Sequence, residues 1–239
     1  MPVPLSVLKQ LNDRLLNSTT NTEKRITFYR KELSKLASPT SNYIAYNREI
    51  DVLNPEGFKV DIADVIRALP KINRFNGQTN RPYSVASHSL MCEKIAFELF
   101  GLSEPHLSLA VMFHDASEAY VGDIVRPIKS SFQGFSALEA RIMKKVYYEL
   151  GFKENELKDV YNKNFVELVE EIDTLAACVE ADVLTKVRIL PHYKRISESY
   201  VDKTKNYKAV ASNFLKRYVE LTIKLADLKR RKHENRNVA

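Results

Sequence analysis

Three segments of the chain have apolar residues at helical spacing, and each carries a metal-ligating side chain on its apolar face. His88 lies in the first segment, the adjacent pair His114 and Asp115 ends the second, and Asp173 lies in the third. The apolar residues at helical spacing around His88 are Val85, Met91, Cys92, Ile95 and Leu99. A polar side chain is costly to bury without a partner, and one divalent cation could pair with all four of these side chains. The pattern therefore predicts a helical domain with a metal centre.

Two imidazoles and two carboxylates would give the cation a mixed nitrogen and oxygen ligand shell. Such a shell suits Mn, Fe, Co or Zn and, less well, Mg, so the sequence leaves the identity of the metal open. Because the shell contains no thiolate, it disfavours a closed structural zinc site. Four protein ligands on an octahedral ion leave positions for water and for a substrate oxygen, so the expected chemistry is metal-assisted hydrolysis.

Residues close to the His-Asp pair are the candidate catalytic groups. Asp115 is one of them, because it would hold the cation next to the reacting atoms. Glu118 follows Asp115 by about one helical turn, so it could orient or deprotonate the attacking water. Asp123 follows Gly122, which turns the chain back, and it could accept a hydrogen bond from a substrate hydroxyl. We expect Glu118 to act on the water and Asp123 on the substrate.

A loop before the helix of His88 contains Arg74 next to Phe75. A guanidinium group beside an aromatic ring suits a phosphate together with a base or a sugar. Arg81, Arg126 and Lys129 are further but weaker phosphate candidates. We therefore expect Arg74 to bind the phosphate group of a substrate and Phe75 to contact its nucleoside part.

The remaining pattern predicts a mainly α-helical fold with one small β appendage. Helices are expected over residues 5–36, 61–69, 85–100, 105–114, 136–150, 166–185 and 209–230. We expect Gly101 to end the helix of His88 and Ser103 to cap the next one. Aromatic and β-branched residues around Asn47 and Arg48 predict a β-hairpin over residues 43–52, and residues 122–134 are expected to be a loop.

Three parts are expected along the chain: a helical N-terminal extension over residues 1–42, a core over 43–187, and a C-terminal helical segment with a basic tail over 188–239, packed on the same domain. The sequence contains no apolar run long enough to cross a membrane and no signal-peptide pattern. Its two cysteines, Cys92 and Cys178, are interpreted as buried thiols rather than as a disulfide framework. We therefore expect a cytoplasmic protein, in the host cytoplasm if a phage encodes it.

The net charge of +7 leaves two interpretations of the basic C-terminal residues open. They could attract phosphates of nucleotides or nucleic acids, or they could form a solvated tail, which is the interpretation that we favour. Because the sequence contains no recognised DNA-reading motif, a nucleic acid is not the expected partner.

The metal-ligating residues resemble the signature of the HD-domain metal-dependent phosphohydrolases, which is a histidine, a His-Asp pair and a distant aspartate. Four stretches are similar more narrowly to the 5′-deoxynucleotidase branch typified by bacterial YfbR, and these are residues 43–61, 72–75, 83–89 and 114–123. The length of the chain and its N-terminal extension resemble phage members of this branch. Together the similar segments span about residues 43–182.

This resemblance implies a helical bundle, a homodimer and hydrolysis of deoxyribonucleoside 5′-monophosphates. It implies that His88, His114, Asp115 and Asp173 bind the metal. It also implies that Glu118 activates water, Arg74 holds the phosphate and Asp123 reads the 3′-hydroxyl group of the sugar. Phe75 stands where the bacterial enzyme has a tryptophan that crowds the 2′ position of the sugar.

Other functions remain open from the sequence alone. A phosphohydrolase of the same superfamily could act on deoxynucleoside triphosphates, cyclic nucleotides or an alarmone, and its products would differ. A nucleic-acid-binding protein would bind DNA in a salt-sensitive way without turnover. A catalytically silent HD module would lack metal ligands or the catalytic glutamate, whereas His88, His114, Asp115, Asp173 and Glu118 are all present here.

Overall fold

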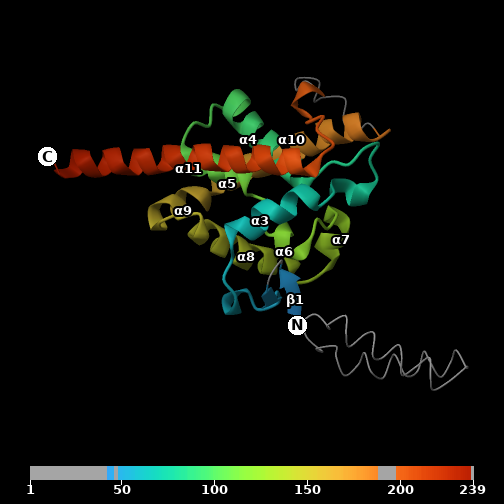
Figure 1. Cartoon of the computed structure of the whole chain (residues 1–239), viewed down its shortest axis with the longest axis horizontal. Coiled ribbons are helices and arrows are strands. Elements are labelled where there is room, and N and C mark those ends of the chain that lie inside the picture. Colours follow the sequence, from blue (N-terminus) through green and yellow to red (C-terminus); the bar gives the residue numbers. More distant parts are fainter. Residues whose placement is uncertain (1–41, 46–47, 188–197, 238–239) are drawn as a thin grey trace, which may run out of the picture. The chain divides into compact units, whose positions relative to one another are not determined.

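The computed structural model describes residues 42–45, 48–187 and 198–237, and the chain divides into two units, Met1–Phe58 and Lys59–Ala239 (Figure 1). The first unit contains strands β1 (Asn42–Ala45) and β2 (Arg48–Asp51), which pair antiparallel. The predicted β-hairpin is therefore present. The helical extension expected over residues 1–42 lies outside the described residues, apart from Asn42 in β1.

The second unit is built from helices, and this confirms the prediction of a mainly α-helical fold. The α-helices of this unit are α3 (Ile62–Ala68), α4 (Val85–Phe100), α5 (Pro105–Met112), α6 (Glu118–Val121), α7 (Arg126–Ser131), α8 (Phe135–Glu149), α9 (Glu154–Val160), α10 (Lys163–Leu184) and α11 (Tyr207–Asn237). The prediction of a loop over residues 122–134 was wrong in part, because this segment contains α7. No helix among the described residues combines the length and the apolar character that spanning a membrane requires.

Helix α4 has the boundaries that the sequence predicts, because both of its ends are capped. At the N-terminus the side chain of Ser84 accepts a hydrogen bond from the backbone N–H of Ser87. At the C-terminus Gly101 adopts a left-handed conformation with φ of 67°, which a glycine tolerates without a steric penalty. These two caps fix the register in which α4 presents His88.

Helix α5 begins and ends differently from the prediction. Its N-cap is Glu104 rather than Ser103, because Pro105 occupies the first turn and favours an extended backbone at the residue before it. The helix ends at Met112, and the chain then forms a turn in which the N–H of His114 bonds the carbonyl oxygen of Val111. His114 and Asp115 therefore lie in this turn and not inside the helix.

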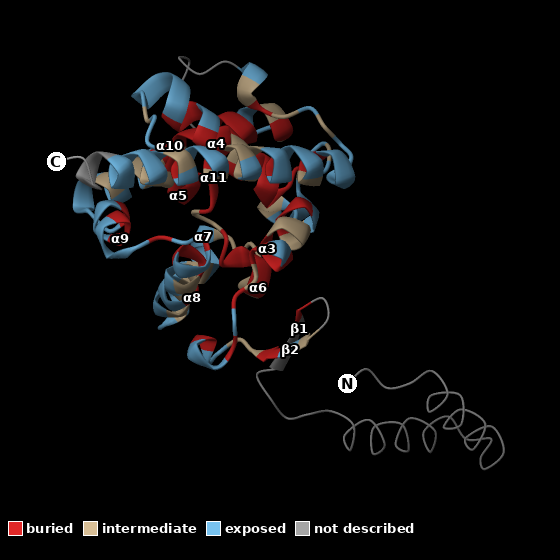
Figure 2. Cartoon of the chain, turned by 60° about the vertical axis from the view of Figure 1, so that its left-hand side comes forward, coloured by how far each residue is buried: buried red, intermediate tan, exposed pale blue. Residues whose placement is uncertain are grey.

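The hydrophobic core lies between α4, α5, α10 and α11. Helix α4 packs against the other three, and α11 also packs against α5. Figure 2 shows that the buried residues lie on the facing sides of these helices. Helix α11 contributes Phe214, whose ring lies 5.3 Å from that of Phe113, and Arg217, which binds the buried carboxylate of Glu93 on α4. The part of the expected C-terminal segment that forms α11 thus packs on the helices that carry the candidate site.

Candidate active site

The four predicted metal ligands meet at one point, although α4, the turn after α5, and α10 supply them. The Nε2 atom of His88 lies 3.1 Å from Oδ1 of Asp173 and 3.7 Å from Oδ2 of Asp115. The same Asp115 oxygen lies 3.2 Å from Nε2 of His114. Neighbouring ligand atoms bound about 2.0–2.2 Å from one cation are separated by roughly 2.8–3.6 Å. Two of these spacings fall in that range and the third is slightly longer, so the cluster suits a shared ion.

Hydrogen bonds at the other nitrogen of each imidazole ring support this arrangement. Nδ1 of His88 lies 2.8 Å from Oε1 of Glu180, and Nδ1 of His114 lies 2.8 Å from the carbonyl oxygen of Val111. Each Nδ1 therefore donates its hydrogen, which leaves the lone pair of Nε2 for a cation. Nε2 of His114 is buried, and its 3.2 Å approach to Oδ2 of Asp115 does not have the geometry of a hydrogen bond. This donor set fits a divalent metal ion.

The two candidate carboxylate ligands are held in their charged form. Burial opposes the charge of Asp115, but His114, His88 and Arg74 keep its pKa well below the usual range. Burial also opposes the charge of Asp173, whereas the hydrogen bond and charge of His88 lower its pKa to about 2. Both groups therefore provide anionic oxygens at neutral pH.

The two histidines have raised pKa values in the cation-free protein. Burial and the charge of Arg74 oppose protonation of His88, but Glu180 and the hydrogen bond to Asp173 raise its pKa well above the ordinary value. Burial likewise opposes the charge of His114, and Asp115 raises its pKa. Protons therefore compete with a cation for these two side chains.

Arg74 projects into the site from a left-handed turn. The following residues, Phe75 and Asn76, have φ values of 55° and 50°, which non-glycine residues rarely adopt. The guanidinium places Nη1 3.6 Å from Asp115 and Nη2 4.0 Å from Asp173. Burial opposes the charge of Arg74, but the carboxylates of Glu180, Asp115 and Asp173 raise its pKa. The predicted phosphate-binding residue thus lies against the candidate metal ligands.

Glu180 is a central residue of the site that the sequence analysis missed. It is completely buried on α10, where Oε1 faces His88 and Oε2 accepts a hydrogen bond of 3.0 Å from Nε of Arg74. Burial raises the pKa of Glu180, but the charges of His88 and Arg74 outweigh it and keep the pKa low. A signal was present in the sequence, because residues seven positions apart share one face of a helix and Asp173 is seven residues before Glu180.

A pocket of about 420 Å³ opens beside these side chains. The predicted residues Phe75, Glu118 and Asp123 line it, together with Arg74, Asp115 and Asp173. The lining also includes the apolar residues Ile124, Val125, Ala177 and Cys178. The pocket therefore combines charged and apolar side chains, as a site for a small charged organic molecule would.

Glu118 is the first residue of α6 and is only 4% exposed. Its Oε2 atom is buried and has no hydrogen-bond partner in the part of the chain that the structure describes. Burial and the nearby charges of Asp115 and Asp123 raise the pKa of Glu118 well above the ordinary range. Burial and Asp115 also raise the pKa of Asp123. The pocket thus contains two carboxyl groups that hold protons more strongly than usual.

Of the weaker phosphate candidates, two line this pocket and one does not. Arg126 lies 3.1 Å from Oδ2 of Asp173, and Lys129 lies 2.7 Å from Oε1 of Glu139. Arg81 instead donates a hydrogen bond to the backbone of Asp202 and is absent from the residues that line the pocket. Arg74 is therefore the most buried of the predicted phosphate-binding residues in the pocket.

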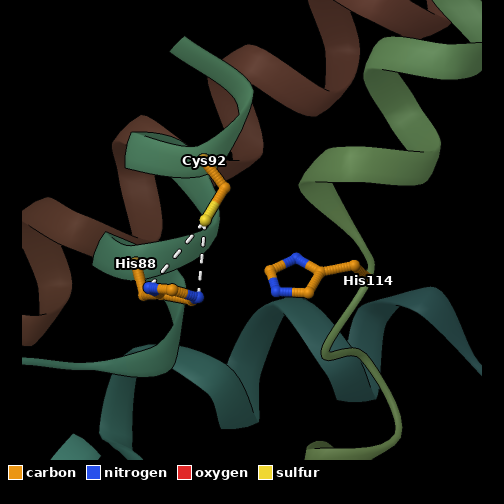
Figure 3. Close-up of side chains that lie close together, drawn as sticks. All are labelled: His88, Cys92 and His114. Carbon is orange, nitrogen blue, oxygen red and sulfur yellow. Dashed lines mark hydrogen bonds between the residues drawn. The ribbon is translucent and has the colours of Figure 1, made fainter. Parts of the chain in front are cut away.

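Cys92 adds a sulfur atom to the histidine pair (Figure 3). Its Sγ atom lies 3.4 Å from Nε2 of His88, and ligand atoms of His88, Cys92 and His114 all lie within 4.8 Å of one another. Burial raises the pKa of the Cys92 thiol, and the charges of Asp173 and Glu180 raise it further against the opposing effect of His88. A protonated thiol is a poor ligand, so the two ionised carboxylates are the better partners for the histidines. The predicted burial of Cys92 and Cys178 is confirmed.

Residues 61–228 match the family described as 5′-deoxynucleotidase YfbR-like, which covers more than half of the chain. The chain belongs to the YfbR-like family. This family is part of the HD-domain superfamily, so the protein is of the HD phosphohydrolase type, and divalent metal dependence is implied. The match runs through α10 into α11, beyond the segment that the sequence analysis identified, and begins after the β-hairpin.

Two curated relatives of this YfbR-like protein have low identity. An uncharacterized protein of Rhodobacter capsulatus is 32% identical over 142 residues, which cover 56% of this chain and 68% of the relative. The uncharacterized protein YfdR of Escherichia coli is 32% identical over 81 residues, which cover 34% of this chain and 42% of YfdR.

Proposed function

We propose that this protein is a metal-dependent 5′-deoxynucleotidase, which hydrolyses deoxyribonucleoside 5′-monophosphates to deoxynucleoside and phosphate. The observation that carries the proposal is the position of Arg74. Its terminal nitrogens lie 3.6 and 4.0 Å from Asp115 and Asp173, and all three residues line the pocket. A phosphate group that binds Arg74 would therefore lie next to the candidate metal ligands.

In this proposal His88, His114, Asp115 and Asp173 hold one divalent cation. When bound, the cation would supply a Lewis acid that polarises the phosphoryl group and acidifies water. Mn, Co, Mg, Fe and Zn are all compatible with this nitrogen and oxygen donor set. Arg74 would donate hydrogen bonds to the phosphate oxygens and stabilise negative charge as the phosphorus is attacked.

Glu118 is the group that we propose to take the proton of the attacking water. Its buried Oε2 atom has no hydrogen-bond partner among the residues described. Burial and the charges of Asp115 and Asp123 raise its pKa in the cation-free protein, and the positive charge of a bound cation would oppose this effect, so that the ionised carboxylate can act as the base. Asp123 would accept a hydrogen bond from the 3′-hydroxyl group of the sugar. Phe75 would lie against the sugar, and the apolar lining residues of the pocket would contact the base.

The charges of the pocket favour a monophosphate over a triphosphate. Arg74 is buried and directed at the candidate metal ligands, whereas Arg126 is 75% exposed and bound to Asp173, and Lys129 is bound to Glu139. A triphosphate would need further cations to offset its charge. Hydrolysis of deoxynucleoside triphosphates is therefore the second candidate activity.

Phosphate release from a panel of deoxynucleoside monophosphates, ribonucleoside monophosphates and deoxynucleoside triphosphates would test this proposal. Each substrate is assayed with Mn, Co, Mg or Zn and with an EDTA control. We expect metal-dependent phosphate release from the deoxynucleoside monophosphates. Release of triphosphate from the deoxynucleoside triphosphates alone would overturn the substrate assignment, and equal rates with ribonucleotides would show that Phe75 does not exclude a 2′-hydroxyl group.

Some expectations from the sequence remain predictions. They are a homodimer, a location in the cytoplasm, a phage origin, and domain boundaries at residues 42 and 187. Light scattering of the purified protein would test the homodimer directly.

A further inference from the structure

One buried carboxylate connects a candidate metal ligand to the candidate phosphate-binding arginine. Oε1 of Glu180 lies 2.8 Å from Nδ1 of His88, and Oε2 lies 3.0 Å from Nε of Arg74. Glu180 is completely buried, and it does not line the pocket in which the proposed reaction takes place. Its partners are His88, Arg74 and the hydroxyl group of Tyr83, and of these His88 and Arg74 belong to the candidate site.

The contact with His88 determines which nitrogen of the ring is free. An ionised carboxylate can only accept hydrogen bonds, so Nδ1 of His88 must be the nitrogen that donates to Glu180. In the neutral ring the lone pair then lies on Nε2, which is the atom that faces Asp173 at 3.1 Å. Carboxylate partners of this kind orient metal-ligating histidines and increase their basicity.

The contact with Arg74 determines the direction of the guanidinium group. Glu180 engages Nε, so both terminal nitrogens are left to face Asp115 and Asp173. A planar guanidinium that is fixed in this way presents two parallel donors to an incoming phosphate. Because Arg74 comes from a left-handed turn far along the chain from α10, this hydrogen bond also holds the turn against the site.

We propose that Glu180 is a positioning residue, which fixes the tautomer of His88 and the direction of the Arg74 guanidinium at the same time. Metal binding and phosphate binding would then depend on a single carboxylate. The part that concerns Arg74 rests on the proposed phosphohydrolase function, whereas the part that concerns His88 does not.

The substitution Glu180→Gln tests this proposal while it keeps the size of the side chain. The amide has one acceptor oxygen and one donor nitrogen, so it cannot accept hydrogen bonds from His88 and Arg74 together. The matched control is Glu93→Gln, because Glu93 is also buried on a helix of the core and binds the side chain of Arg217. Glu93 does not line the pocket, so its replacement removes a buried acceptor without touching the site.

Two measurements examine His88 without any substrate. The affinity for Co²⁺ is measured by titration, and the tautomer of His88 is determined by nitrogen NMR on the cation-free protein at a pH where the ring is neutral. For Glu180→Gln we expect a roughly 10–100-fold loss of Co²⁺ affinity, as for other outer partners of metal ligands, and a larger share of the tautomer with hydrogen on Nε2. Glu93→Gln should keep both properties.

A third measurement examines Arg74. At saturating metal, Glu180→Gln should raise KM for a deoxynucleoside monophosphate by about 10-fold or more, the loss expected for one charge-assisted hydrogen bond. In an Arg74→Ala background the same substitution should no longer change KM, whereas it should still weaken Co²⁺ binding. If Glu180 were only structural, its replacement would affect KM and Co²⁺ binding alike, with or without Arg74.

The outcomes distinguish this inference from the proposed function. Wild-type Co²⁺ affinity and an unchanged His88 tautomer in Glu180→Gln would overturn the inference even if the enzyme hydrolyses deoxynucleotides. Equal losses in Glu93→Gln would overturn it as well. If the wild-type protein hydrolyses no nucleotide, the proposed function fails, and the Co²⁺ and NMR measurements still decide the role of Glu180 at His88. If Glu180→Gln does not fold, Glu180→Asp retracts the carboxylate by one methylene, and wild-type Co²⁺ affinity in that variant would overturn the inference.

Discussion

The Nε2 atom of His88 on α4 lies 3.1 Å from Oδ1 of Asp173 on α10, and both atoms face the side chains of His114 and Asp115. Neither helix could form this arrangement alone, because each contributes only one of the four candidate ligands. The packing of α4 against α10 therefore brings the ligands of the candidate metal centre together. Substitutions of these ligands test the metal centre directly.

Replacement of Asp173 by alanine should remove metal binding and activity together. The substitution deletes an anionic ligand atom and leaves His88 without its nearest carboxylate oxygen. We expect the affinity for the activating metal to fall by more than about 100-fold, beyond the usual effect of outer partners. Metal analysis after dialysis and a phosphate-release assay measure both effects. Asp182→Asn on the exposed side of α10 is the control, and full metal content in Asp173→Ala would refute the ligand assignment.

Arg74→Ala should weaken substrate binding and catalysis while it leaves the metal in place. The guanidinium group is a cation, so its loss does not remove a ligand, and Glu180 keeps its contact with His88. Loss of a hydrogen bond to a charged group costs about 1.5–3 kcal/mol, which corresponds to roughly a 10–150-fold fall in kcat/KM. Steady-state kinetics with metal quantification checks this, and a metal-free variant protein would contradict it.

Glu118→Gln should bind both metal and substrate but turn over slowly. The amide keeps the shape of the side chain and cannot take a proton from water. General base catalysis contributes about 10²–10⁴-fold, so kcat should fall by that factor with little change in KM. Substrate binding is measured separately by calorimetry with the inactive variant. An unchanged kcat would assign the proton transfer to another group.

Metal binding should become weaker as the pH falls and should release protons at neutral pH. The pKa values of His88 and His114 are raised in the cation-free protein, so protons occupy these rings at a higher pH than in a free imidazole. A cation binds Nε2 only after that nitrogen has lost its proton. Calorimetry in buffers with different ionisation enthalpies counts the protons released. A binding enthalpy that is the same in all buffers at pH 7 would contradict this prediction.

Cys92→Ala should preserve metal binding, because the carboxylates provide the oxygen ligands and the buried thiol remains protonated. The Co²⁺ complex of the wild-type protein should then lack a thiolate-to-cobalt charge-transfer band. Affinity in the variant should stay within a few-fold of wild type, whereas Asp115→Ala should lose it. An intense thiolate band that disappears in Cys92→Ala would show that the metal binds to His88, Cys92 and His114 instead.

Much of the fold could be read from local chemistry. Serine and glycine at the two ends of α4 fixed its boundaries, and the residues around Asn47 and Arg48 indicated the hairpin. The predicted N-terminal boundaries of α5 and α10 were wrong, because residues near each boundary favour a different cap. The N-cap of α5 is Glu104, because Pro105 occupies the first turn of the helix. Helix α10 begins at Lys163, earlier than predicted, because the side chain of Asn162 caps it by accepting a hydrogen bond from the N–H of Asn164.

The sequence by itself indicated the candidate ligands, since His88, His114, Asp115 and Asp173 lie in or directly after apolar segments and are costly to bury unless they share a partner. It also determined the mainly helical fold through periodicity and capping, which depend on residues close together in the chain. Only the tertiary structure decided how Glu180 joins His88 to Arg74, that Cys92 lies beside the histidines, and which apolar residues line the pocket. Those contacts arise where helices distant in sequence pack together, and local spacing does not encode the direction in which a buried side chain meets its partner.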